Sequence, residues 1–194
     1  MAKTDRTTII FAILVFAAIT AYAVLRTTVF DAQIPIVGDE ATDFRIPGLD
    51  GKEVHLAALR GNVVFVNFWA TWCPPCRDEM PSLQSLAHRF RGRPFQMVAV
   101  SVDGEGRSIV RKFLEKGRYD IPVFLDPGGK LAFDYGVVKY PETIVIGAEG
   151  KVREKFIGPF DWMDEKLVAK IEALIVEAER GAGMVDETDK ELGH

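Results

Sequence analysis

Apolar and polar residues follow one another in blocks that predict a mixed α/β domain. The apolar run at residues 63–68 is of the buried-strand type, and residues 95–102, with an apolar centre at 97–100, predict a second strand. The segment that follows Cys73 and residues 107–116 place apolar residues on one face at helical spacing. Before the first run, Asp50-Gly51 between two short extended segments predicts a β-hairpin.

The second half of the chain predicts shorter elements and one long helix. The short elements are a strand, a helix and the two strands of a hairpin, at residues 123–125, 131–135, 143–146 and 152–157. Residues 161–180 carry apolar positions at i, i+1, i+4, i+7, i+8 and i+11, and Gly181 is expected to end this helix. The order of elements predicts a central mixed β-sheet flanked by helices, preceded by an N-terminal β-hairpin.

The N-terminus carries an uncharged segment, residues 7–25, which follows Lys3 and Arg6. Nineteen residues at about 1.5 Å each span roughly 28 Å, close to the thickness of a bilayer core. The two basic residues predict a cytoplasmic N-terminus. We predict an uncleaved N-terminal transmembrane helix. The alternative is a cleaved signal peptide, because Ala21-Tyr22-Ala23 resembles a cleavage site; either interpretation exports the domain.

The chain therefore divides into four parts. These are a cytoplasmic N-terminus with a membrane anchor, a linker, a globular domain and a polar tail predicted to be disordered, at residues 1–30, 31–37, 38–180 and 181–194. A composition of 48% hydrophobic and 27% charged residues suits one domain. The net charge of −4 argues against a nucleic-acid partner, whose binding needs a basic surface.

The only two cysteines, Cys73 and Cys76, stand two residues apart between a predicted buried strand and a predicted helix. Two thiols there can close and open a disulfide, and the helix N-terminus favours the thiolate. A structural disulfide over so short a loop would constrain the unfolded chain little. A zinc site needs about four ligands, and a haem-attachment site needs a histidine where Arg77 stands. Dithiol–disulfide exchange is the leading hypothesis.

Helical spacing after the cysteines predicts unequal thiols. Cys76 shares an apolar stripe with Met80, Leu83, Leu86, Ala87 and Phe90. Cys73 lies outside this stripe, so we predict an exposed, attacking Cys73 and a partly buried, resolving Cys76. Glu79 falls inside the stripe, where burial would raise its pKa and suit it to proton transfer. The alternative is that Glu79 turns out to solvent or caps backbone. Pro81 is expected to kink the helix.

Residues 67–81, Asn-Phe-Trp-Ala-Thr-Trp-Cys-Pro-Pro-Cys-Arg-Asp-Glu-Met-Pro, resemble the active-site signature of the thioredoxin superfamily. They are most similar to the membrane-anchored TlpA/ResA/CcmG (DsbE) branch, and the similarity covers roughly residues 36–178. The resemblance implies a thioredoxin-like fold, Cys73 as nucleophile, Cys76 as resolving thiol and Glu79 as the acidic residue kept beside the dithiol. It implies no cofactor or metal beyond a redox-active Cys73–Cys76 disulfide. Asn67 stands where ordinary thioredoxins have a buried aspartate.

The same resemblance implies a surface that binds the substrate chain. Pro141 matches the family's cis-proline, which faces the dithiol; an ordinary trans proline is the alternative. The implied substrate-binding residues are Trp72, Pro74, Pro75, Tyr140 and Pro141. Residues 136–143 are similar to the G-V-x-G-x-P-E-T segment of CcmG, but Lys139 and Tyr140 depart from it. Residues 117–138 resemble the helix–strand insertion of this branch.

By resemblance, the protein reduces disulfides in exported clients, apocytochrome c first, during cytochrome c maturation. A membrane electron transporter of the DsbD/CcdA kind would re-reduce it on the periplasmic side of the cytoplasmic membrane. Three alternatives stay open. One is an oxidase, isomerase or general reductase. Another is a peroxidase, although Val66 and Ala70 replace the Pro and Thr of a P-x-x-x-T-x-x-C motif. The third is a non-catalytic, chaperone-like binding module.

Overall fold

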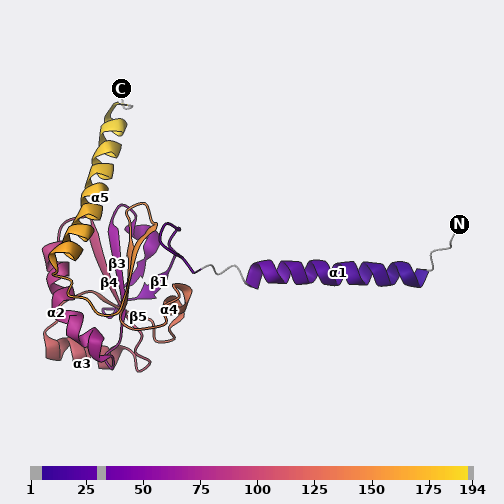
Figure 1. Cartoon of the computed structure of the whole chain (residues 1–194), viewed down its shortest axis with the longest axis horizontal. Helices are drawn as coiled ribbons and strands as arrows, with labels where there is room; N and C mark the ends of the chain where they lie inside the picture. Colours follow the sequence, from indigo (N-terminus) through magenta and orange to yellow (C-terminus); the bar gives the residue numbers. More distant parts are fainter. Residues whose placement is uncertain (1–5, 30–33, 192–194) are drawn as a thin grey trace. The chain divides into compact units, whose positions relative to one another are not determined.

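The computed structural model describes residues 6–29 and 34–191 (Figure 1). Predictions for residues 1–5, 30–33 and 192–194, which include Lys3 and part of the linker, lie outside the described residues. The chain separates into two compact units, Met1–Gln33 and Ile34–His194. Each unit is described by itself.

The N-terminal unit contains one described helix, α1 (Arg6–Val29). Apolar side chains such as Phe11, Leu14 and Phe16 are exposed along it. Across the residues that the structure describes, no helix meets the combined length and hydropathy requirement for crossing a membrane. The transmembrane helix over residues 7–25 therefore stays a prediction.

The second unit is built on a five-stranded mixed sheet in the order β5-β4-β3-β6-β7. Its strands are β3 (Val63–Trp69), β4 (Phe95–Ser101), β5 (Val123–Leu125), β6 (Glu142–Ile146) and β7 (Val152–Ile157). The first three are parallel to one another, and β6 runs antiparallel to both β3 and β7. The seven residues of β3 are all buried, which is why all of them except Asn67 are apolar. The mixed sheet predicted from the sequence is confirmed.

A separate two-stranded sheet precedes β3, as the turn signal predicts. Its strands, β1 (Arg45–Pro47) and β2 (Glu53–His55), are antiparallel, and a 3₁₀ helix, η1 (Leu56–Leu59), follows them. Gly51 in the turn has a φ of 92°, a left-handed conformation that glycine adopts without strain. The Gly48 amide donates to the Lys52 carbonyl at 2.6 Å and closes the hairpin.

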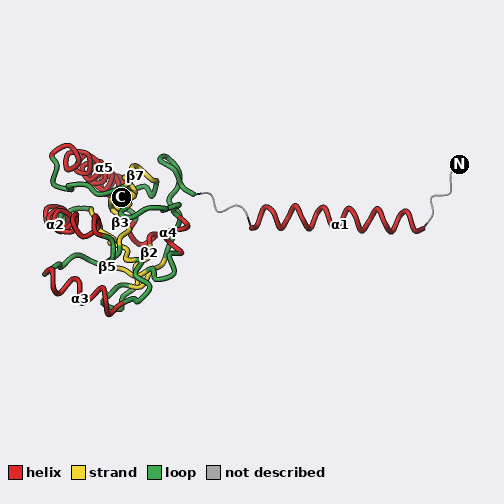
Figure 2. Tube along the Cα trace, turned by 60° about the horizontal axis from the view of Figure 1, so that its bottom comes forward, coloured by secondary structure: helices red, strands yellow, loops and turns green. Residues whose placement is uncertain are grey.

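Helices cover the two faces of the sheet (Figures 1 and 2). One face packs against α2 (Pro74–Arg89), α3 (Arg107–Gly117) and α5 (Glu165–Glu191). The other face packs against α4 (Lys130–Asp134), η1 and the hairpin. Residues of β3 alternate between these two cores, so Phe65, Asn67 and Trp69 face α2, and Val64, Val66 and Phe68 face α4.

The last helix differs from its prediction at both ends. It begins at Glu165 rather than at Asp161, because the Asp164 carboxylate accepts hydrogen bonds from the Lys166 and Leu167 amides and caps the first turn. It continues through Gly181 to Glu191, so the described part of the tail predicted to be disordered is helical. A glycine inside a helix costs only about 1 kcal/mol, which good helix-forming neighbours offset.

We expect that replacing Phe65 by Ala lowers the free energy of unfolding by about 3–5 kcal/mol, because it leaves a cavity in the core. The Phe65 ring is fully buried, and its centroid lies 4.7 Å from that of Trp162. Urea denaturation measures the change. Phe133→Ala is the matched control, since Phe133 is 75% exposed and its loss should change stability by at most about 0.5 kcal/mol. Equal effects of the two substitutions would contradict the assignment of Phe65 to the core.

Candidate active site

The two cysteines lie where β3 gives way to α2. Cys73 occupies the N-cap position of the helix in an extended conformation, and Pro74 and Pro75 fill the first two helical positions. Prolines are favoured there because they have no amide hydrogen that needs a partner and their φ is already helical. The Cys76 amide donates a hydrogen bond to Cys73 Sγ at 3.3 Å. The sulfur of Cys73 therefore sits at the positive end of the helix, which favours its thiolate.

Cys73 and Cys76 form a disulfide, with Cα atoms 5.3 Å apart. Cys76 is fully buried, and Cys73 is 5% exposed. The order of exposure agrees with the prediction, but the prediction of an exposed Cys73 is wrong for the disulfide form. The bond to Cys76 and the hydrogen bond from its amide hold the Cys73 sulfur against the first turn of α2.

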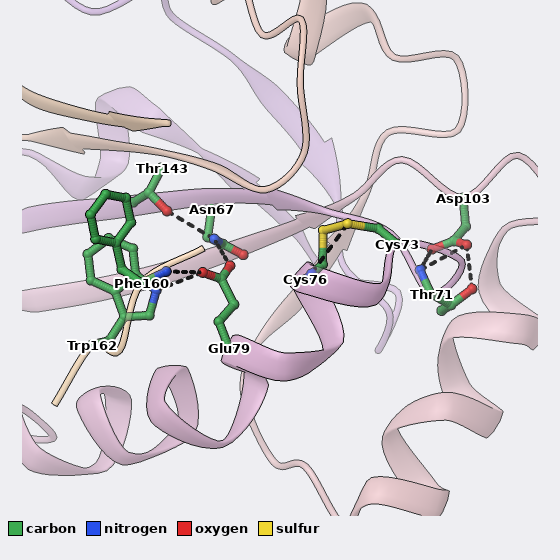
Figure 3. The surroundings of a disulfide bond; sticks show 9 residues. All are labelled: Asn67, Thr71, Cys73, Cys76, Glu79, Asp103, Thr143, Phe160 and Trp162. Carbon is green, nitrogen blue, oxygen red and sulfur yellow. Dashed lines mark hydrogen bonds between the residues drawn. A yellow bond between two sulfur atoms is a disulfide. The ribbon is translucent and has the colours of Figure 1, made fainter. Parts of the chain in front are cut away.

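Glu79 points into the protein, as its place on the apolar stripe predicts, and only 3% of it is exposed. Its Oε1 accepts a hydrogen bond from Asn67 Nδ2 at 2.9 Å. Its Oε2 accepts from the Phe160 amide at 3.3 Å and from Trp162 Nε1 at 3.2 Å (Figure 3). Burial raises the pKa of Glu79 from 4.5 to about 7, and these three donors only partly oppose that rise. The alternative of a solvent-exposed Glu79 is excluded.

Asn67 connects Glu79 to the strand beside it. Its side chain is fully buried, and Nδ2 donates both to Glu79 and to Thr143 Oγ1, each at 2.9 Å. The register of β3 and β6 pairs Asn67 with Thr143, which explains why these two side chains meet. Within the described residues Asn67 Oδ1 has no hydrogen-bond partner. An amide cannot accept a proton at neutral pH, so Glu79 is the titratable group of this cluster.

The turn that carries the dithiol is fastened to β4 by Asp103, a residue that the sequence analysis did not identify. Asp103 is 2% exposed and accepts hydrogen bonds from the Thr71 amide at 3.0 Å and the Thr71 hydroxyl at 2.6 Å (Figure 3). Ser101 Oγ donates to the same carboxylate at 2.7 Å. Because β3 and β4 are parallel, their carboxyl ends meet at one edge. The sequence signal that could have identified this contact is a polar residue shortly after each of the two strands, Thr71 after β3 and Asp103 after β4.

The predicted substrate-binding residues meet beside this turn. The peptide bond between Tyr140 and Pro141 is cis, as the resemblance implies. The Tyr140 ring lies edge-on to that of Trp72, with centroids 6.0 Å apart. Trp72 is 62% exposed, whereas Trp69 is fully buried and packs against Phe113. An aromatic pair of an exposed Trp72 and a partly buried Tyr140 therefore stands next to the cysteines.

The helix α2 contains Pro81 and runs without interruption to Arg89. Residues 117–138, which the resemblance marks as an insertion, contain β5 and α4. Two of the histidines are paired on the surface, His55 with Asp43 and His88 with Asp120, each at 2.7 Å. Among the residues that the structure describes, no group of three or more histidine, cysteine or acidic side chains is arranged to hold a metal ion.

Comparison with known proteins agrees with this geometry. Residues 37–155 match the AhpC/TSA family. The chain is 37% identical over 122 residues to a thiol-disulfide oxidoreductase ResA of Bacillus cereus, and the match covers 63% of this chain and 70% of that protein. The ResA of Geobacillus thermodenitrificans is 35% identical over 161 residues, or 83% of this chain and 90% of that protein.

Among solved structures, one from Chlorobium tepidum, described as a thiol:disulfide interchange protein DsbE, is similar with a TM-score of 0.63 and 33% identity. It covers 74% of this chain, and 98% of its own length is matched. The fold, the helix-capping disulfide and these matches lead to one conclusion. The chain belongs to the AhpC/TSA family, as a thioredoxin-like thiol-disulfide oxidoreductase of the ResA/DsbE type whose redox-active group is the Cys73–Cys76 disulfide.

Proposed function

We propose that the protein reduces disulfides in exported client proteins, with apocytochrome c as the first client, during cytochrome c maturation. The observation that carries this proposal is the buried Glu79, whose pKa is about 7 and which lies one helical turn beyond Cys76. Relatives described as ResA and DsbE support the choice of a thiol-disulfide reaction.

The reaction exchanges one disulfide for another. The Cys73 thiolate attacks a client sulfur, so a mixed disulfide forms and the client disulfide breaks. The Cys76 thiolate then attacks Cys73 Sγ, the internal disulfide forms, and the client leaves as a dithiol. Two electrons pass to the client, and its two sulfurs take up two protons. The helix N-terminus stabilises the Cys73 thiolate, which is the form that attacks in the first step.

Glu79 has the proton affinity that the second step needs. A carboxyl group with a pKa of about 7 is roughly half ionised at neutral pH, so it can take the Cys76 proton and later return one. Asn67, Phe160 and Trp162 hold the carboxylate in place through their N–H groups. Ordinary thioredoxins have a buried aspartate at the position of Asn67 in β3. In this protein the acidic group is instead Glu79, on α2.

The client chain would lie across the aromatic pair, Trp72 and Tyr140, and along the backbone before Pro141. Apolar side chains next to the client cysteines can pack on the two rings, which supply contact area at a small cost in conformational entropy. This surface adjoins Cys73 because Trp72 immediately precedes it.

Location at a membrane is part of the proposal. Residues 7–25 carry no charge and lie in α1, whose described apolar side chains are exposed. We propose that this segment is a single-pass anchor in the cytoplasmic membrane, with the catalytic domain on the extracytoplasmic side. A membrane electron transporter of the DsbD/CcdA kind would re-reduce Cys73–Cys76. Tethering would raise the effective concentration of the protein near this donor.

A Cys76→Ser variant should accumulate mixed disulfides with its clients, because Cys73 can still attack but the resolving thiol is missing. The variant is expressed in the native host, and the trapped partners are identified by mass spectrometry. Apocytochrome c among the partners is the expected result. The Cys73→Ser/Cys76→Ser variant, which should trap nothing, is the control. A set of unrelated secreted proteins without apocytochrome c would identify a general reductase instead.

The stability of the oxidised protein should fall as the pH rises from 4.5 to about 7. Because the folded pKa of Glu79 is raised, the folded state holds this proton more tightly than the unfolded state, so its contribution is present below pH 4.5 and lost near pH 7. The difference between wild type and Glu79→Gln should change by about 3 kcal/mol over this range. Urea denaturation at several pH values measures it.

Glu177→Gln is the control for this pH series, because Glu177 is an exposed carboxylate whose pKa is lowered by its hydrogen bond to Arg153. Its loss should leave the slope between pH 4.5 and 7 unchanged. Parallel stability curves for wild type and Glu79→Gln would show that the carboxyl group titrates normally in the folded protein.

Replacing Phe11 and Leu14 by Asp should release the protein from membranes, since each charge near the centre of a span costs about 2.5–3.5 kcal/mol. Alkaline extraction followed by fractionation measures the release. Phe133→Asp, an exposed position in the domain, is the control and should leave the distribution unchanged. A mature wild-type protein that begins after Ala23 would show that the segment is a cleaved signal peptide.

A further inference from the structure

The loop of residues 136–141, here called the proline loop, carries Tyr140 and Pro141 but is weakly held by its own backbone. It connects the end of α4 to the start of β6. The Gly136 and Val137 amides bond back to α4, and the Pro141 carbonyl accepts from the Gly158 amide at 2.9 Å. Between these points, within the described part of the chain, the backbone of residues 138–140 makes no hydrogen bond to other protein groups. The position of Tyr140 therefore depends on how the two ends are fixed.

One side chain, Lys155 of β7, contacts both ends. Its Nζ lies 2.9 Å from Glu142 Oε1 and donates a hydrogen bond to the Tyr135 carbonyl oxygen at 3.2 Å. Tyr135 is the residue before the proline loop and the C-cap of α4, and Glu142 is the residue after the loop. Lys155 stands opposite Ile144 in the sheet register, and Glu142 is the diagonal neighbour on the same face.

This ion pair differs from those on the surface because one partner is buried. Glu142 is 1% exposed, and Lys155 Nζ is the cation that faces its carboxylate. Among the described residues neither carboxylate oxygen of Glu142 has a partner with hydrogen-bond geometry, so the charge of Lys155, 2.9 Å from Oε1, carries most of the compensation. Removing one partner of a buried pair leaves an uncompensated charge, which is strongly destabilising locally. The start of β6, and with it the proline loop, would have to shift.

The charge on Glu142 also reaches the aromatic pair. Burial raises the pKa of Tyr140, and the negative charges of Asp126 and Glu142 raise it further. The Glu142 carboxylate, which Lys155 faces, therefore acts on the same ring that stands edge-on to Trp72.

We propose that Lys155 is a positioning residue for client binding: it joins the two ends of the proline loop and so sets Tyr140 and Pro141 against Trp72. The inference rests on the proposed function, since it concerns the surface on which a client disulfide would lie. Lys155 touches neither the client nor the sulfurs. Its loss should weaken binding of an extended peptide and leave the chemistry of the dithiol intact.

The test compares a peptide with a small disulfide. The peptide is synthetic, contains an oxidised Cys-x-x-Cys-His sequence with flanking residues, and is reduced by the full chain with an excess of reductant. Lys155→Met should raise KM for this peptide about tenfold, the equivalent of one lost hydrogen bond to a charged group. Its kcat, and its rate constant with oxidised glutathione, should change less than about twofold.

Two single variants serve as controls. Lys155→Arg keeps a cation that can reach both Glu142 and the Tyr135 carbonyl, so KM should return close to the wild-type value. Lys170→Met removes the same charge from an exposed pair with Glu154 and should leave KM unchanged. A KM that rises equally in Lys170→Met and Lys155→Met would overturn the inference, because net charge would then account for the effect.

A double variant, Glu142→Gln/Lys155→Met, removes the link between the two loop ends without leaving a buried charge unpaired. It also replaces the single variant Lys155→Met if that variant fails to fold. Its KM should stay raised, because the loop ends remain unconnected. A return to the wild-type KM would overturn the inference. If the wild-type protein reduces the peptide and Lys155→Met has an unchanged KM, the inference alone fails. If the wild-type protein does not reduce the peptide, the proposed function fails and the inference with it.

Discussion

A carboxyl group kept away from water is the constraint on which the active site depends. Glu79 belongs to α2, and its hydrogen bonds tie that helix to Asn67 of β3 and to Phe160 and Trp162 before α5. A buried carboxylate without such donors would be too costly to keep. Without burial, its proton affinity would be that of an ordinary glutamate. The same contacts that stabilise the packing of three elements therefore set the acid strength beside the disulfide.

The sheet uses its two faces for separate tasks. Thr143 and Glu142 are neighbours in β6, but alternation along the strand sends Thr143 toward Asn67 and Glu142 toward Lys155. The first contact belongs to the network around Glu79, and the second to the support of the proline loop. The residues for proton transfer and those for client positioning therefore lie on opposite faces of the sheet. Both faces are reached from the two residues that directly follow the cis-proline, Glu142 and Thr143.

Local patterns in the sequence predict much of this arrangement, because they are physical consequences of it. The apolar run of β3, the spacing of Cys73 and Cys76, and the helical position of Glu79 each identify an element or a buried face. Two of the three partners of Glu79, Phe160 and Trp162, are 81 and 83 positions away, and Asp103 meets Thr71 across two strands. Such contacts depend on tertiary packing. The passage of α5 through Gly181 was missed because a helix-breaking propensity is only a weak preference.

The amide at position 67 has a consequence for how the redox couple responds to its surroundings. Asn67 is fully buried and has no proton to lose near neutrality, so Glu79 is the member of this pair that can exchange protons with the thiols. The pH dependence of the midpoint potential then depends on Glu79 as well as on the two thiols, and the pKa of Glu79 is raised by burial and lowered by three N–H donors that are not bonded to sulfur. Natural variation around Phe160 and Trp162 can adjust the driving force of the enzyme while its cysteines stay the same.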